Sequence, residues 1–274
     1  MKKLLLLIIL LNSFISAQDK IKFFADDLLI QPYTANNLEP KLGFLFQIGN
    51  NELRLDIGNS IDVMRYAISE NETFSFGADL FTYTLLRGES NFHFPVDAVD
   101  YLFGFNFGYV NNLDNFKYGA RLRFSHISAH FVDGHYDNVN KQWLDGRNPR
   151  VYSREFFELM PFVKINQIRV YAGLTYLINT TPSHLGKDIY QLGFDYFADN
   201  LITDGITPFV GYDFRLEHLN EYSGTNSFNA GIKFGKPNGK GLSLYFNYFS
   251  GKSIHGEYYD YSKQYSAIGI NLDL

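Results

Sequence analysis

Apolar and polar residues alternate along the chain from Lys41 onward, and this alternation is the pattern of strands with one apolar face. In 101–109 the odd positions are Tyr or Phe, and Leu, Gly and Asn stand between them. The same alternation recurs in 116–124 and 228–235. It predicts about twelve strands, which occupy 41–48, 52–68, 72–85, 98–110, 116–128, 150–165, 168–178, 188–197, 207–216, 226–236, 241–250 and 260–274.

The lengths of these segments and the character of their polar faces favour a transmembrane barrel over a soluble sandwich. Many segments hold about 10 to 14 residues, near the length that a tilted strand needs to cross a bilayer. The polar faces are rich in Gly and charged residues, as in a barrel lumen, and Tyr gathers at segment ends, as at membrane interfaces. Longer connections are expected at one end of the barrel, at 86–97, 129–149, 179–187, 217–225 and 251–259, and short turns at the opposite end. The short turn 49–51 is an exception, because it falls at the end with the longer connections.

These patterns predict an all-β fold, a single antiparallel transmembrane β-barrel of about 12 strands over residues 41–274. Its expected location is the outer membrane of a Gram-negative bacterium, with outer-membrane lipids as its partners. Residues 1–17 carry two lysines, an apolar run and a small-residue cleavage site, which predicts a signal peptide. Residues 18–40 are expected to form a periplasmic N-terminal segment, for which a short helix, a plug entering the lumen and a disordered tether are alternatives.

The composition of the chain excludes several other kinds of chemistry. None of the 274 residues is cysteine, which excludes disulfide scaffolds, thiolate catalysis and zinc–thiolate sites. The net charge of −5 argues against a nucleic-acid partner, because such a partner requires a basic face. Beyond the leader, no apolar run approaches the roughly 18 residues of a membrane-spanning helix. We expect no cofactor and predict no particular oligomeric state.

Charged residues of both signs fall on the lumen-facing positions of the predicted strands. They are Asp79, Asp100, Lys117, Arg121, Arg123, Arg154, Glu158, Asp195, Asp213, Arg215 and Lys233. Because the signs are mixed, we expect ion pairs to fill the lumen rather than a selective channel. A small solute pore remains an alternative, since lumen charges also tune selectivity.

The densest group of reactive side chains lies in 125–135. By strand parity, His126 and Ser128 share the outward face of one strand, and Glu155 lies on the outward face of the next. A serine nucleophile, a histidine base and a carboxylate that orients the imidazole form an acyl-transfer arrangement. On the exterior of a barrel, this arrangement would meet the ester bonds of outer-leaflet lipids.

This arrangement is similar to that of outer-membrane phospholipase A and lipid A 3-O-deacylase, which place a His-x-Ser pair on an outward strand. The match covers His126, Ser128 and loosely Glu155. Two alternatives stay open. These side chains are solvated among lipid headgroups at the rim, or His130, Asp133 and His135 join His126 in a metal site, for which the spacing is not compact.

The chain as a whole resembles an uncharacterised bacterial family of outer-membrane β-barrels, the domain of unknown function DUF1207. Three motifs carry the resemblance: Phe24-Ala25-Asp26 with Leu28 and 32–40, His126-x-Ser128-x-His130-x-x-Asp133, and Tyr152-Ser153-Arg154-Glu155. The resemblance implies a surface barrel without an assigned activity. Two functions are therefore carried forward: a non-enzymatic barrel with a structural, binding or narrow-pore role, and an outer-leaflet lipid esterase or deacylase.

Overall fold

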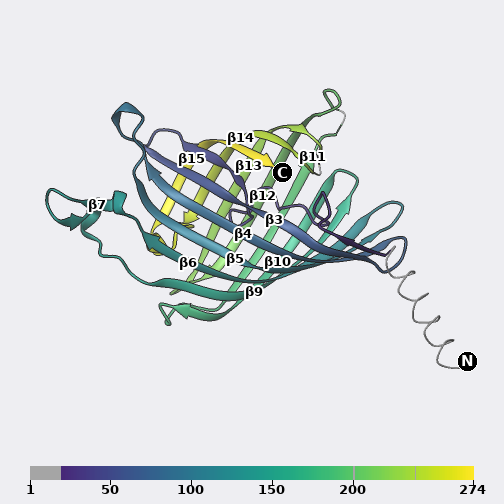
Figure 1. Ribbon diagram of the computed structural model, residues 1–274, viewed down its shortest axis with the longest axis horizontal. Helices are drawn as coiled ribbons and strands as arrows, with labels where there is room; N and C mark the ends of the chain where they lie inside the picture. Colours follow the sequence, from purple (N-terminus) through teal and green to yellow (C-terminus); the bar gives the residue numbers. More distant parts are fainter. Residues whose placement is uncertain (1–19, 200, 238) are drawn as a thin grey trace, which may run out of the picture.

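Twelve strands of the protein form a closed antiparallel barrel (Figure 1). The structure is a computed structural model that describes residues 20–274 except 200 and 238, so the predicted signal peptide lies outside the described residues. The barrel strands are β2 (Leu42–Gln47), β3 (Glu52–Ala67), β4 (Glu72–Arg87), β5 (Val96–Asn112), β6 (Lys117–Phe131), β9 (Tyr152–Ile165), β10 (Ile168–Thr181), β11 (Asp188–Phe197), β12 (Ile206–His218), β13 (Tyr222–Gly235), β14 (Gly241–Lys252) and β15 (Ser262–Asp273). The predicted fold class is confirmed.

Each barrel strand pairs with its neighbours in the chain, and the short strand β2 closes the ring by pairing with both β3 and β15. A further strand, β1 (Ile21–Phe23), pairs with the far end of β3. A small hairpin of β7 (Tyr136–Asp137) and β8 (Gln142–Trp143) projects from the longest connection (Figure 1). The described residues contain no α-helix, and the short 3-10 turns are η1 (Ser90–Phe92), η2 (Asp133–His135), η3 (Leu144–Gly146) and η4 (Gly256–Tyr258).

The connections define two ends of the barrel. At the turn end the strands are joined by 68–71, 113–116, 166–167, 198–205 and 236–240. At the loop end they are joined by 48–51, 88–95, 132–151, 182–187, 219–221 and 253–261. The predicted long connection 217–225 is wrong, because strand pairing continues through polar residues to His218 and Tyr222. Backbone hydrogen bonds sustain a ladder whatever the polarity of the side chains, so the apolar pattern ended before the strands did.

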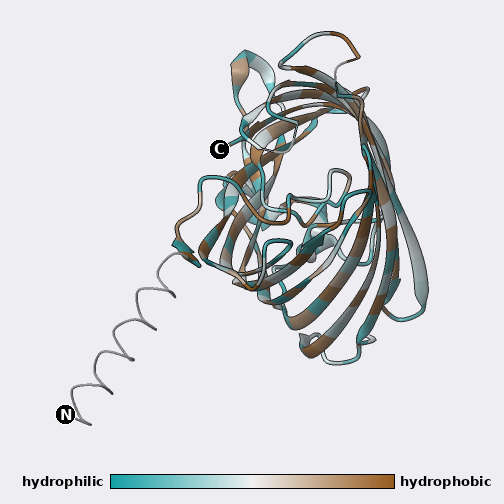
Figure 2. Cartoon of the chain, turned by 90° about the vertical axis from the view of Figure 1, so that its right-hand side faces the viewer, coloured by the Kyte–Doolittle hydropathy of each residue, from teal (hydrophilic) through white to brown (hydrophobic). Residues whose placement is uncertain are grey.

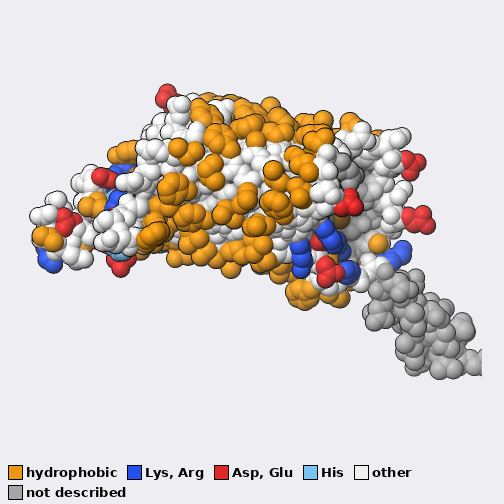
Figure 3. Space-filling model, turned by 90° about the horizontal axis from the view of Figure 1, so that it is seen from above, with side chains coloured by type: hydrophobic (Ala, Val, Ile, Leu, Met, Phe, Trp, Pro, Cys, Tyr) orange, Lys and Arg blue, Asp and Glu red, His pale blue; other side chains and the backbone are white. Residues whose placement is uncertain are grey.

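The barrel is apolar outside and polar inside, the reverse of a soluble protein. Outward residues such as Leu80 and Leu192 are 62% and 60% exposed, whereas the inward residues Arg123 and Asp100 are fully buried. Figure 3 shows hydrophobic side chains over the middle of the visible face and charged ones near both ends. Within the described part of the chain, no helix has both the length and the apolar character needed to cross a membrane.

The N-terminal segment enters the barrel rather than extending away from it. Figure 2 shows the chain that follows β1 running inside the ring of strands before it reaches β2. Tyr33 and residues 35–40 of this segment are buried. Of the three arrangements considered for residues 18–40, the part from residue 28 onward therefore adopts the plug. We refer to residues 28–40 as the plug below.

Candidate functional site

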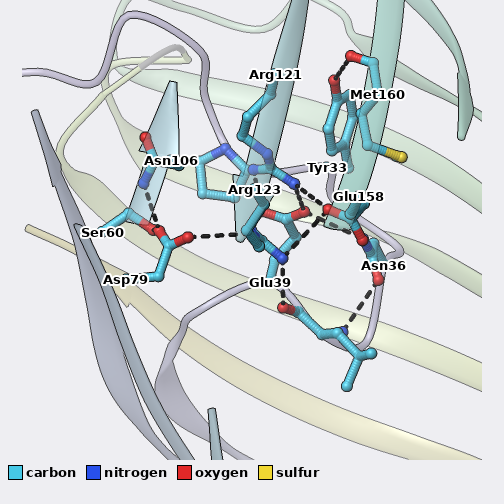
Figure 4. Close-up of polar contacts among 12 residues, drawn as sticks. Tyr33, Asn36, Glu39, Ser60, Asp79, Asn106, Arg121, Arg123, Glu158 and Met160 are labelled. Carbon is cyan, nitrogen blue, oxygen red and sulfur yellow. Dashed lines mark hydrogen bonds and ion pairs between the residues drawn. The ribbon is translucent and has the colours of Figure 1, made fainter. Parts of the chain in front are cut away.

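The plug is held by two arginines of β6. Arg121 forms a bidentate pair with Glu39, donating from Nη1 to Oε2 over 2.8 Å and from Nη2 to Oε1 over 2.5 Å. Arg123 donates to the same carboxylate over 3.4 Å and to the carbonyl of Leu38 over 3.4 Å. All three charged side chains are buried, and Figure 4 shows both guanidinium groups directed at Glu39. The barrel wall thus supplies the counter-charges for the plug.

Two carboxylates of the wall complete a charge cluster, which consists of Glu39, Asp79, Arg121, Arg123 and Glu158. Glu158 Oε1 lies 3.4 Å from Nη2 of Arg121 and 3.4 Å from Nη1 of Arg123. Asp79 Oδ2 lies 3.0 Å from Arg123 Nε. Burial alone would raise the pKa of Glu39, but the two guanidinium groups outweigh burial and hold this pKa at about 2. The cluster therefore sets three carboxylates against two guanidinium groups.

Arg169 of β10 anchors the other half of the plug. It donates to the carbonyls of Gln31 over 2.6 Å and Pro32 over 2.7 Å, and its Nε donates to Asp195 over 2.8 Å. Its guanidinium carbon also lies 4.4 Å from the ring centre of Tyr33, a cation–π distance. The plug is thus fixed to the wall at two places along its length.

A second segment closes the loop end. The connection 253–261 folds inward, and His255 Nδ1 lies 2.8 Å from Oδ2 of the buried Asp100. Arg150, from the long connection before β9, donates to the carbonyl of Glu257 over 2.7 Å. We call the connection 253–261 the lid. Its contacts come from both the barrel wall and a neighbouring connection, so it is held from two sides.

An apolar layer joins the lid to the plug. Leu38 of the plug belongs to this layer, and Ile254 of the lid packs against it. The buried members are Leu38, Phe81, Tyr83, Leu102, Ile127, Phe156, Leu177 and Ile189. The half of the lumen nearest the loop end is therefore filled by side chains as a small protein core is.

The half nearest the turn end contains a pocket of about 260 Å³. The plug forms one side of it, through residues 28–34. Five cationic side chains and two carboxylates line the pocket: Lys41, Lys117, Lys164, Arg169, Lys233, Asp195 and Asp273. Apolar side chains line the remainder, among them Leu28, Leu29, Phe162, Phe197, Phe209 and Tyr245. The pocket thus combines positive charge with an apolar surface.

The charged residues predicted for the lumen do lie on inward positions, but the sequence did not single out several that matter most. Glu39, Tyr33 and Arg169 were outside the predicted set. The plug carries no alternation, and Pro32 and Pro40 rule out a regular ladder there because proline lacks an N–H donor. Its polar run before the first strand was the signal within the segment itself.

The outward residues His126, Ser128 and Glu155 lie where strand parity placed them. His126 and Glu155 are directly opposite each other on β6 and β9, and His126 Nδ1 lies 2.6 Å from Glu155 Oε1. Ser128 is opposite Ser153, and the described residues show no hydrogen bond between Ser128 and His126. The structure thus forms the histidine–carboxylate half of the predicted arrangement.

The residues of the metal alternative do not converge. His130 is exposed on the outward face beside Tyr101, and Asp133 is exposed in the following connection. His135 is buried on the inside, where its Nδ1 lies 3.4 Å from Asp97 Oδ1. Within the described residues, no three His, Asp or Glu side chains are grouped as metal ligands.

Comparison with known families gives a match over most of the barrel. The family described as Protein of unknown function (DUF1207) matches residues 90–274. The chain belongs to the DUF1207 family. The resemblance inferred from the sequence is confirmed, and the matched range of this DUF1207 member includes Arg121, Lys117 and the outward His126. No curated protein matches the chain.

Solved structures similar to this DUF1207 member include outer-membrane barrels. Outer membrane phospholipase A from Escherichia coli is 14% identical, with 88% of this chain and 93% of that chain covered and a TM-score of 0.55. A calcium-bound dimer of the Salmonella typhi outer membrane phospholipase is also 14% identical, with 90% and 94% covered and a TM-score of 0.55. At this identity, the similarity shows a shared fold alone.

Proposed function

We propose that the chain is an outer-membrane barrel with a closed lumen that binds a small ligand in its turn-end pocket. The apolar outward face and the similarity to barrels of the outer membrane support the location. In such barrels the short turns face the periplasm, so the pocket opens on the periplasmic side. This proposal takes the binding role from the three non-enzymatic roles considered above.

One observation carries the proposal: the plug and the lid both lie inside the lumen, and an apolar layer joins them. A solute that crossed the barrel would have to displace this layer and break buried ion pairs. The pocket lies on one side of these barriers and meets the wall only at the turn end. Its mixture of apolar and convergent polar groups is typical of small-molecule sites.

Conductance across a planar bilayer tests the closed lumen. We expect the reconstituted wild-type protein to give no steady ohmic current, because the plug is fixed by Arg121 and Arg169 and the lid by Asp100. A general porin reconstituted in the same bilayer is the positive control for insertion. A steady, ohmic current from the wild-type barrel would contradict the proposal and favour a narrow pore.

A second candidate is an outer-leaflet lipid esterase, and the contact between His126 and Glu155 favours it. In this mechanism, Ser128 Oγ would attack the ester carbonyl while His126 takes its proton, and Glu155 would orient the imidazole. The attack would form a serine ester and release the alcohol, and water would then release the fatty acid. It requires Ser128 to turn toward His126 when a lipid binds.

Release of fatty acid from phospholipid and lipid A vesicles tests the esterase. If this candidate holds, Ser128→Ala reduces release to background, because no nucleophile remains. Ser153→Ala is the matched control, since Ser153 lies opposite Ser128 on the same outward face, and it should leave release unchanged. Equal release from wild type and Ser128→Ala, or none from either, would reject the esterase.

A further inference from the structure

The turn-end pocket contains a row of three positive side chains on adjacent strands. Lys117 on β6 is directly opposite Lys164 on β9, and Lys164 is directly opposite Arg169 on β10. Like charges at directly opposed positions destabilise a sheet. Asp195 forms an ion pair with Arg169. The row therefore places three positive side chains next to one another on the pocket wall.

Two lysines of the pocket differ from Lys233 in their contacts. Within the described residues, neither Lys41 nor Lys117 makes a hydrogen bond or an ion pair, whereas Lys233 pairs with Asp273 over 2.7 Å. Burial lowers the pKa of Lys41 to about 8, and the positive charge of Arg54 is the second cause of this shift. The pocket thus offers Lys117 as a cation that forms no ion pair within the described residues.

The wall beside Lys41 is incomplete, and this suggests how a ligand reaches the pocket. Strand β2 pairs with β3 only as far as Ile57, and β1 resumes the pairing at Met64, so no strand of the described chain pairs this edge of β3 in between. A small cavity of about 30 Å³ lies at this seam, lined by Lys41, Gly58 and Leu272 among others. It shares Lys41 and the plug residue Leu28 with the large pocket.

The outer surface around the seam is mostly apolar, with the exposed Asn59 as a polar residue between Ile57 and Ile61. Ile57 and Ile61 of β3 are 51% and 45% exposed, and Leu272 and Leu274 across the seam are 41% and 58% exposed. In the proposed orientation, this part of the wall meets the periplasmic leaflet of the membrane. The seam therefore lies between a hydrocarbon environment outside and a cationic pocket inside.

We propose that the pocket binds an anionic amphiphile, whose phosphate or carboxylate group lies among Lys117, Lys164 and Arg169 and whose apolar chain lies along the plug toward the seam beside Lys41. This inference rests on the proposed function and specifies the class of its ligand. Apolar residues on the pocket wall, such as Phe162 and Leu29, would contact the chain. A free inorganic anion would satisfy the cations but would leave this apolar surface in contact with water.

Native mass spectrometry of the full-length mature protein, released from a nonionic detergent, distinguishes the ligands. Three probes are compared: lysophosphatidic acid, lysophosphatidylcholine, which has the same chain and no net charge, and inorganic phosphate. We expect one lysophosphatidic acid to be retained per barrel, with weaker retention of the other two. Lys117→Gln should weaken that retention about tenfold, because it removes one charge-assisted contact.

Lys141→Gln is the matched control, because it makes the same change at an exposed lysine of the loop end and should leave retention unchanged. Heat-modifiable migration on a gel shows that each variant is folded. Retention of phosphate equal to that of lysophosphatidic acid would overturn the amphiphile, and equal retention of lysophosphatidylcholine would overturn the anionic group. Both results would leave ligand binding intact, whereas no retention of any probe would overturn the inference and the proposed binding function together.

Discussion

Replacing Arg121 with methionine should lower the free energy of unfolding by about 4 kcal/mol, because removing one partner of a buried ion-pair network leaves uncompensated charge. In this variant Glu39, Asp79 and Glu158 would remain buried with Arg123 as the remaining guanidinium of the cluster. Urea unfolding in detergent micelles, followed by the fluorescence of the single tryptophan and by gel mobility, measures the change.

The charge count of the cluster predicts an order among variants. Glu39→Gln should lower the free energy of unfolding by about 3 kcal/mol, which is less than Arg121→Met, because Glu158 and Asp79 remain to balance the two arginines. Glu70→Gln, at an exposed turn, makes the same chemical change outside the cluster and should have no measurable effect. If Arg121→Met proved as stable as Glu70→Gln, the cluster would not hold the plug.

The sequence was sufficient to predict the barrel because side-chain alternation and strand direction are coupled by a period of two. Once the parity of β6 was set by Phe124, the outward position of His126 and the inward position of Arg123 followed. Parity also placed Glu155 on the outward face of the next strand, but it did not fix the register. The structure sets His126 directly opposite Glu155, and the contact between them depends on this register as well as on the shared face.

The plug could not be predicted in the same way, because its position depends on contacts between residues far apart in the chain. Arg121 gave one indirect signal: its directly opposed neighbours are Gly108 and Met160, neither of which can neutralise it. A buried arginine without a carboxylate opposite it requires a partner at another position. Glu158 of β9 lies 3.4 Å away, and Glu39 of the plug is the bidentate partner, which parity gives no means to identify.

For the pocket too, the sequence predicted which side chains face the lumen but not which segment encloses them. The sequence placed Lys117 and Lys233 on the lumen side, and each is there. The closed side of the pocket is formed by the plug, and the seam depends on how early the chain leaves the wall at Lys41. Strand parity thus places the cationic side chains on the lumen side. A segment without a periodic pattern then encloses them.

Acid should unfold the barrel in a manner that depends on Glu39. The pKa of this carboxyl is about 2 in the folded protein and 4.5 in its ordinary state, so protons bind preferentially to the unfolded chain. Its contribution, about 3 kcal/mol from this difference, is complete above pH 4.5 and is lost as the pH falls toward 2. Unfolding free energies measured by urea titration between pH 7 and pH 2 give the profile.

The comparison of variants isolates this carboxyl from the others that titrate in the same range. In Glu39→Gln the fall in stability between pH 4.5 and pH 2 should be shallower than in wild type by about 3 kcal/mol, whereas Glu70→Gln should follow the wild-type profile. Arg121→Met should regain part of its deficit in acid, because protonation removes repulsion among the remaining carboxylates. Parallel profiles for wild type and Glu39→Gln would mean that Glu39 does not carry its charge inside the barrel, and the ion-paired plug would then lose its electrostatic basis.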